Sequence, residues 1–143
     1  MKFLKIYVII LGICISCDSD DRVDNPFLPN LNVNFTANLN LPQFDKLEFP
    51  GETVIVASES IGIKGLILHN VNGELFTAFE LSDPNHTPNA CSSQTVEGTI
   101  ATCNCEEGNQ YYVNTGLPLT EDLEYGLKPY KITKQGNNLI ISN

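Results

Sequence analysis

The chain has 143 residues and is acidic, with 17 Asp and Glu residues against 8 Lys and Arg and a formal net charge of −9. A chain of this length provides one domain that can bury a core of ordinary size. The negative charge argues against nucleic acid and anionic lipid headgroups as binding partners, because both would be repelled.

The N-terminal segment has the parts of a secretory signal peptide: two lysines, an unbroken apolar run over residues 6–15 and a small residue before Cys17. The apolar run is short for a membrane span. The end of the segment, Ile15-Ser16-Cys17, resembles a bacterial lipobox, although Cys14 stands where such motifs usually carry Leu. We therefore expect residues 1–16 to be a lipoprotein signal peptide and Cys17 to be acylated, for example with palmitate. The alternative is an N-terminal core strand or helix.

An acidic cluster follows Cys17 directly, with four aspartates between residues 18 and 24. This composition predicts that residues 17–30 form a solvated, disordered tether. An acidic run behind a lipidated cysteine resembles the signal with which some Gram-negative bacteria send lipoproteins to the outer face of the outer membrane, whereas a plain spacer has the same composition. The expected location is the outer membrane, with the protein lipid-anchored at the cell surface.

Residues 31–143 show the pattern of an all-β domain. Residues 33–41 alternate strictly between apolar and polar side chains, which predicts a strand with one buried and one wet face. Asn72-Gly73 predicts a tight hairpin turn, and no stretch past residue 17 sustains the spacing of an amphipathic helix. Further strands are expected over residues 54–57, 65–69, 75–81, 99–103, 110–113, 130–133 and 139–142, with a loop-rich insertion over residues 82–120.

The loop-rich segment holds most of the side chains that could carry chemistry: Asp83, His86, Cys91, Cys103, Cys105, Glu106 and Glu107. The sequence has no nucleophile elbow, no phosphate-binding glycine loop, and no Ser or Cys beside a plausible His base. An enzyme is therefore not expected. We expect His86 to bond to the loop backbone and His69 to lie on a sheet face.

The order of these residues resembles the two cluster-binding loops of Rieske iron–sulfur proteins. Residues 83–91 correspond to the first loop and residues 103–106 to the second, while residues 63–79 and 127–141 resemble the flanking hairpins. In that family a C-x-H loop and a C-P-C-H-G loop supply two Cys to one iron and two His to the other. The resemblance implies a Rieske-like antiparallel β-sandwich or small barrel over residues 31–143.

The resemblance retains few of the four cluster ligands. Cys103 falls on the ligand cysteine of the second loop, but Glu106 stands where its histidine should be. In the first loop Asp83 falls on the cysteine and Asn85 on the histidine, with His86 one place later. Carboxylates suit a sulfide-bridged iron centre badly, so we expect that no cofactor is bound. The alternative is a 2Fe-2S electron-transfer centre on the unusual ligands Asp83, His86, Cys103 and Glu106.

Three cysteines beyond Cys17 are left for disulfides, which are the default in small exported domains: Cys91, Cys103 and Cys105. Some Rieske proteins join their two loops by a disulfide, and the resemblance implies that Cys91 and Cys105 are the corresponding pair. A Cys91–Cys103 bridge competes with it, because Cys103 and Cys105 would project from the same face of a strand. A zinc site built from His86 and the three cysteines is a further alternative, although its C-x-C spacing is unusual.

The expected function is that of a membrane-anchored, surface-exposed lipoprotein whose Rieske-like domain serves as a structural or binding module. The lipid bilayer is the expected partner, through acylated Cys17. An envelope protein of unknown identity could use a sheet edge or the proline-rich loops as its interface.

Overall fold

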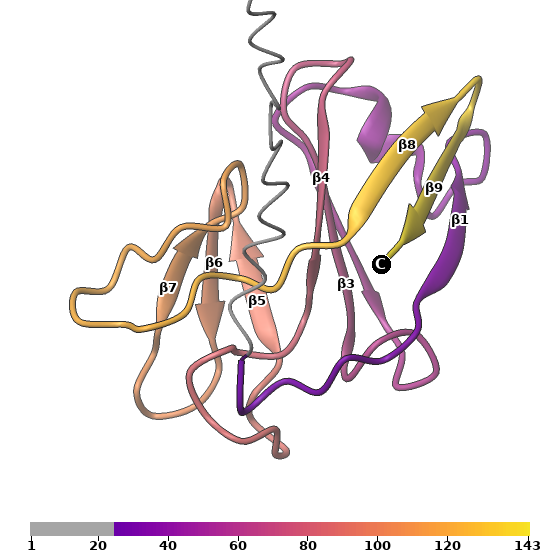
Figure 1. Cartoon of the computed structure of the whole chain (residues 1–143). Helices are drawn as coiled ribbons and strands as arrows, with labels where there is room; N and C mark the ends of the chain where they lie inside the picture. The colour runs from indigo at the N-terminus through magenta and orange to yellow at the C-terminus, as the bar shows by residue number, and fades with distance from the viewer. Residues whose placement is uncertain (1–24) are drawn as a thin grey trace, which may run out of the picture.

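The computed structural model describes residues 25–143, so the expected signal peptide, the acylation at Cys17 and residues 17–24 of the expected tether lie outside the described residues. All strand pairs within residues 25–143 are antiparallel, and they form three sheets with the orders β1-β9-β8, β2-β3-β4 and β5-β6-β7 (Figure 1). The elements are β1 (Asn34–Asn38), the 3₁₀ turn η1 (Asp45–Glu48), β2 (Thr53–Ala57), β3 (Gly65–Asn70), β4 (Phe76–Glu80), β5 (Gln94–Glu97), β6 (Ile100–Cys103), β7 (Gln110–Tyr112), β8 (Lys131–Gln135) and β9 (Asn138–Ser142). The predicted all-β class is confirmed.

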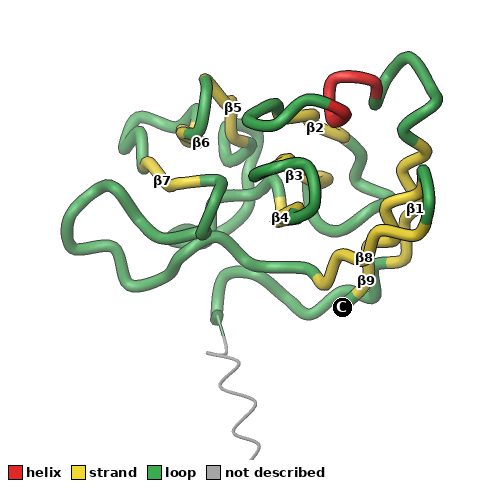
Figure 2. The backbone as a smooth tube through the Cα atoms, turned by 90° about the horizontal axis from the view of Figure 1, so that it is seen from above, coloured by secondary structure: helices red, strands yellow, loops and turns green. Residues whose placement is uncertain are grey.

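Strand β3 lies between two hydrophobic cores. Successive side chains of a strand point to opposite faces, and all six residues of β3 are buried. Leu66 and Leu68 pack in the core shared with the β1-β9-β8 sheet, whereas Ile67 packs in the core shared with the β5-β6-β7 sheet. The β2-β3-β4 sheet is therefore the middle layer of the molecule, as Figure 2 shows from above.

The hairpin expected around Asn72-Gly73 is present and joins β3 to β4. Gly73 has a φ of +95°, which favours glycine. The Asn72 carboxamide oxygen accepts hydrogen bonds from the backbone N–H of Glu74 at 3.1 Å and of Leu75 at 2.8 Å. The connection is longer than a two-residue turn, because β3 ends at Asn70 and β4 begins at Phe76.

The strand expected over residues 33–41 is shorter in the structure. Strand β1 ends at Asn38, and the chain then turns into η1 so that Phe44 and Leu47 enter the core. The alternating pattern continued past the true end because Leu39 is also buried, at 6% exposure, without belonging to a strand.

The expected loop-rich segment, residues 82–120, carries the β5-β6-β7 sheet between its loops. Strands β6 and β7 match expected strands, but β5 was not expected. Its sequence, QTVE, contains a single apolar residue and so shows no alternating pattern. Antiparallel pairing with β6 holds these residues in the sheet. Within residues 25–143, no helix has the length and apolar character needed to cross a membrane.

Residues 25–30, which the sequence assigned to the tether, pack against the domain. Leu28 is buried, and the Asn25 carboxamide donates a hydrogen bond to the carbonyl oxygen of Pro84 at 2.8 Å. Lys128 Nζ donates to the carbonyl oxygen of Pro29 at 2.7 Å. The packed domain therefore includes Asn25 and does not start at residue 31.

Candidate functional site

The two loops singled out by the sequence meet in the structure. The first loop, residues 81–93, connects β4 to β5, and the second loop, residues 104–109, connects β6 to β7. A disulfide joins Cys91 to Cys105, with 4.9 Å between their Cα atoms. Among the described cysteines Cys103 is free, so the competing Cys91–Cys103 pair is not the one formed.

His86 of the first loop lies beside Cys103, the last residue of β6. His86 Nε2 lies 3.4 Å from Cys103 Sγ, and His86 Nδ1 lies 3.1 Å from the carbonyl oxygen of Thr87. A carbonyl oxygen can only accept, so Nδ1 carries the ring proton and Nε2 offers a lone pair to the Cys103 thiol. Ligand atoms of His86, Cys103 and Cys105 all lie within 4.8 Å of one another.

Cys103 is a buried thiol, 3% exposed. Burial raises the pKa of Cys103 to about 11; the backbone N–H of Cys105, which donates to Cys103 Sγ at 3.5 Å, acts in the opposite direction. The carboxylates of Asp83 and Glu107 contribute to the same rise in pKa, because they oppose another negative charge nearby. Cys103 is therefore a protonated thiol at neutral pH.

Asp83 and Asn85, at the positions of a cysteine and a histidine in the family pattern, belong to a buried polar network. Asp83 is fully buried, and its Oδ1 accepts from the backbone N–H of Asn85 at 2.7 Å and from the Tyr111 hydroxyl at 3.1 Å. The Asn85 carboxamide donates to the Tyr111 hydroxyl at 2.8 Å and to the carbonyl oxygen of Tyr125 at 2.7 Å. The backbone N–H of Tyr125 donates to Asn85 Oδ1 at 3.0 Å, so both ends of this amide are engaged.

Two details of this network bear on its chemistry. Burial raises the pKa of Tyr111 well above its usual range, which keeps the hydroxyl protonated as a donor to Asp83. Asp83 Oδ2 is buried and has no hydrogen-bond partner among the described residues.

Glu106 is exposed, beside the exposed Glu107, in the turn of the second loop. Gly108 closes this turn with a φ of +58°, and its N–H donates to the carbonyl oxygen of Cys105 at 3.0 Å. Glu106 is not among the residues whose ligand atoms meet at His86. Of the four ligands in the electron-transfer alternative, the structure brings His86 and Cys103 together, places Asp83 beside Cys103, and leaves Glu106 at the surface.

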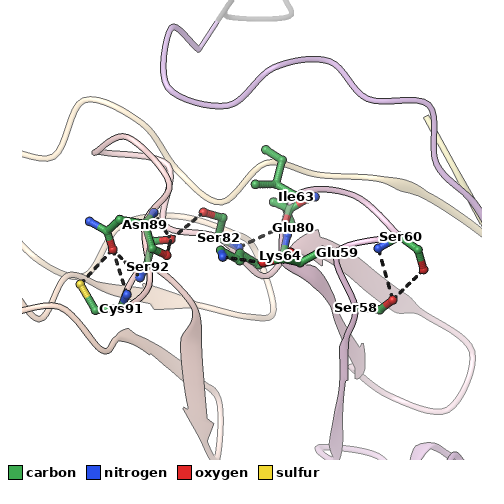
Figure 3. A network of polar contacts seen from close by, with 10 residues as sticks. All are labelled: Ser58, Glu59, Ser60, Ile63, Lys64, Glu80, Ser82, Asn89, Cys91 and Ser92. Carbon is green, nitrogen blue, oxygen red and sulfur yellow. Dashed lines mark hydrogen bonds and ion pairs between the residues drawn. The ribbon is translucent and has the colours of Figure 1, made fainter.

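Glu80, which the sequence did not single out, fixes the end of β4 just before the first loop. This fully buried carboxylate accepts from the backbone N–H of Ile63 and of Lys64, each at 2.8 Å (Figure 3). It also accepts from the Tyr130 hydroxyl at 2.7 Å and from the backbone N–H of Ser82 at 3.2 Å.

Asn89 was also missed, and it shapes the turn that carries Cys91. Its side-chain oxygen accepts from the backbone N–H of Cys91 at 2.9 Å and of Ser92 at 3.1 Å (Figure 3). The Ser92 hydroxyl extends the contact to Ser82 on the opposite side of the loop, at 3.3 Å. Asn is common in such turns, which was the available signal in the sequence.

No protein family model matches the chain, and no curated protein matches its sequence. The structure is similar to the ferredoxin of carbazole 1,9a-dioxygenase from Nocardioides aromaticivorans IC177, with 12% identity, a TM-score of 0.50, and 78% of this chain and 97% of that chain covered. It is also similar to the plasma-membrane Rieske protein of the cyanobacterium Synechocystis PCC 6803, with 17% identity, a TM-score of 0.50, and 80% of this chain and 100% of that chain covered. At these identities the likeness concerns the fold alone. The described domain has a Rieske-like fold.

Proposed function

We propose that this chain is a lipid-anchored bacterial envelope protein whose Rieske-like domain is a disulfide-stapled structural or binding module and holds no 2Fe-2S cluster. The proposed domain performs no catalysis of its own. The proposal rests on which residues occupy the positions in the two loops that correspond to cluster ligands.

The residues at these positions do not fit a Rieske cluster, which needs two thiolates on one iron and two imidazoles on the other. Asp83 and Asn85 are engaged with Tyr111 and with the backbone near Tyr125, and Glu106 is exposed. Of the matching positions, Cys103 alone offers a ligand of the required type. Oxygen donors in the other places are a poor match for a sulfide-bridged iron pair.

The disulfide and the polar network also support a structural role for the two loops. Cys105, which could replace the missing thiolate, is bonded to Cys91. The loops are joined to each other covalently and to residues 111 and 125 by hydrogen bonds. This arrangement orders the loops without any contribution from a metal centre.

Anchoring through Cys17 places the domain close to the bilayer. Asn25 donates a hydrogen bond to the carbonyl oxygen of Pro84 in the first loop. Eight residues, the number from 17 to 24, span at most about 30 Å in a fully extended chain. The lipid supplies the attachment, because an acidic domain is repelled by anionic headgroups. We further propose that the protein is anchored in the outer membrane and exposed at the cell surface.

Cofactor analysis of the full chain, made in a host competent for iron–sulfur assembly and purified in detergent, tests the absence of the cluster. We expect a colourless protein with iron and sulfide far below stoichiometric amounts, while a Rieske protein with intact ligands made in the same host is brown. A brown protein with nearly two irons per chain, and the paramagnetic signal of a reduced mixed-ligand cluster, would establish the electron-transfer alternative instead.

Replacing the proposed anchor tests the location. Cys17→Ser should release the protein from the membrane fraction or stall its processing, and it should abolish labelling by a fatty acid. Protease added to intact cells should digest the wild-type protein if it is exposed at the surface. A Cys17→Ser protein that fractionates and migrates like wild type would refute the anchor.

A further inference from the structure

We propose that opening the Cys91–Cys105 disulfide creates a binding site for a single thiophilic cation such as Zn²⁺, with His86, Cys91, Cys103 and Cys105 as its ligands. This proposal goes beyond the function proposed above, which concerns the disulfide form. It adds a metal site that exists in one redox state of the protein.

The donor atoms already lie at distances close to those of a tetrahedral zinc site. With a zinc–nitrogen bond of about 2.05 Å and a zinc–sulfur bond of about 2.3 Å, the nitrogen and the sulfur lie about 3.6 Å apart. His86 Nε2 and Cys103 Sγ are 3.4 Å apart, and Cys105 Sγ lies within 4.8 Å of Cys103 Sγ and of a ring nitrogen of His86. These three ligands need only small side-chain adjustments to meet one cation.

The fourth ligand becomes available when the disulfide opens. Cys91 Sγ is bonded to Cys105 Sγ. Reduction breaks this bond and turns both sulfur atoms into thiols on the same two adjacent loops, and each thiol can then give up its proton and bind a cation.

The surroundings of the four ligands favour a cation. His86 Nδ1 donates to the carbonyl oxygen of Thr87, which fixes the ring and leaves Nε2 as the ligand nitrogen, as in many zinc sites. The carboxylates of Asp83 and Glu107 act on Cys103 electrostatically and add negative charge around the site. Cys103 is buried, whereas His86 and Cys105 are partly exposed, so a cation can enter from solvent.

The redox step balances with a dithiol as the reductant. The disulfide takes two electrons and two protons to become two thiols, and the dithiol is oxidised to a disulfide. One Zn²⁺ then displaces a proton from each of three thiols and binds the neutral imidazole without displacing any. In the disulfide form only His86 and Cys103 remain as ligands of the four, so the disulfide weakens metal binding.

Metal titration of the full chain in detergent, with Zn²⁺ alone as the probe, tests the site. A phosphine reduces the disulfide, with water supplying the oxygen of the phosphine oxide, and is removed before the titration. We expect one Zn²⁺ per chain in competition with a chromophoric chelator after reduction, and at least 100-fold weaker binding before it. Co²⁺ in the same site should show thiolate charge-transfer absorption.

Single substitutions show whether these four residues are the ligands. His86→Ala and Cys103→Ala should each weaken zinc binding at least about tenfold, since even outer-shell partners of a metal contribute 10- to 100-fold. Glu106→Gln, at an exposed neighbour outside the group, should bind zinc like wild type. Cys91→Ser removes the disulfide without a reductant and should bind zinc through three residues and water.

Several results would overturn the proposed zinc site. Zinc binding that is equal in both redox states, or that survives both His86→Ala and Cys103→Ala, would overturn the proposal. So would the absence of stoichiometric binding in both the reduced protein and the Cys91→Ser variant when circular dichroism shows that they are folded. Uptake of iron and sulfide into the reduced protein, giving a two-iron cluster, would overturn the single-cation site as well.

Discussion

Removing the disulfide should reduce the free energy of unfolding by about 3 kcal/mol. Cys91 and Cys105 are 14 residues apart, and the chain-entropy model for a closed loop of about 15 residues gives 2.1 + 1.5R ln n, or about 10 cal/mol/K, which is about 3 kcal/mol at 298 K. For a domain whose total stability is about 5–15 kcal/mol this is a large fraction. The loss arises mainly in the unfolded chain, which gains conformations when the bridge is absent.

Urea unfolding of the full chain, followed by circular dichroism in detergent and in the presence of a chelator, measures this effect. The Cys91→Ala/Cys105→Ala variant should show a lower midpoint, a larger m-value because its unfolded state is more expanded, and a melting temperature lower by roughly 10 °C. Wild-type protein reduced by a phosphine should lose a similar amount. A loss below about 1 kcal/mol in both samples would refute the claim that the disulfide staples the two loops.

Three further perturbations test the scaffold around the loops. Glu80→Gln should cost about 3 kcal/mol in urea unfolding, because an amide nitrogen cannot accept the two hydrogen bonds that one carboxylate oxygen now receives. Burial lowers the pKa of His69 below 6.5, so the unfolded chain binds a proton at a higher pH than the folded domain does. The free energy of unfolding should therefore fall as the pH drops through 6.5, by at most about 1.4 kcal/mol per pH unit, and His69→Gln should flatten this slope between pH 7.5 and 5. Gly65→Ala should prevent stable folding, because its Cβ would lie 1.9 Å from the carbonyl oxygen of Val56, whereas Gly136→Ala, with nothing within 4 Å, should cost only about 1–2 kcal/mol in the same urea assay.

The fold was predictable because its strands carry local signals. Alternation of apolar and polar residues, together with turns such as Asn72-Gly73, predicted most strands to within one or two residues. Strand β5 has no such signal, because its place is set by its pairing with β6 and not by its own four residues. The same holds for residues 25–30, whose polar composition indicated a tether although Leu28 is buried and Asn25 bonds to the first loop.

The sequence indicated which two loops come together, but not how their side chains meet. The order of cysteines and the histidine along the chain indicated which loops matter. The contact between His86 and Cys103, which are 17 residues apart, depends on how the first loop meets the end of β6. Asn85 and Glu80 could not be assigned from the sequence, because their roles consist of tertiary hydrogen bonds to Tyr125 and Tyr130.

The disulfide and the proposed zinc site compete for Cys91 and Cys105, and their magnitudes decide which state prevails under which condition. The disulfide contributes about 3 kcal/mol to stability. Structural zinc bound by Cys and His ligands contributes about 10–16 kcal/mol to folding in small zinc domains. Bound zinc stabilises the reduced domain by RT ln(1 + [Zn²⁺]/Kd), so it offsets the loss of the bridge when the free Zn²⁺ concentration exceeds Kd by a little more than about 100-fold, and above that concentration zinc should stabilise the reduced domain beyond the disulfide form. The redox environment therefore selects the state: an oxidant retains the bridge, and a dithiol reductant with zinc present converts the domain to the metal-bound form.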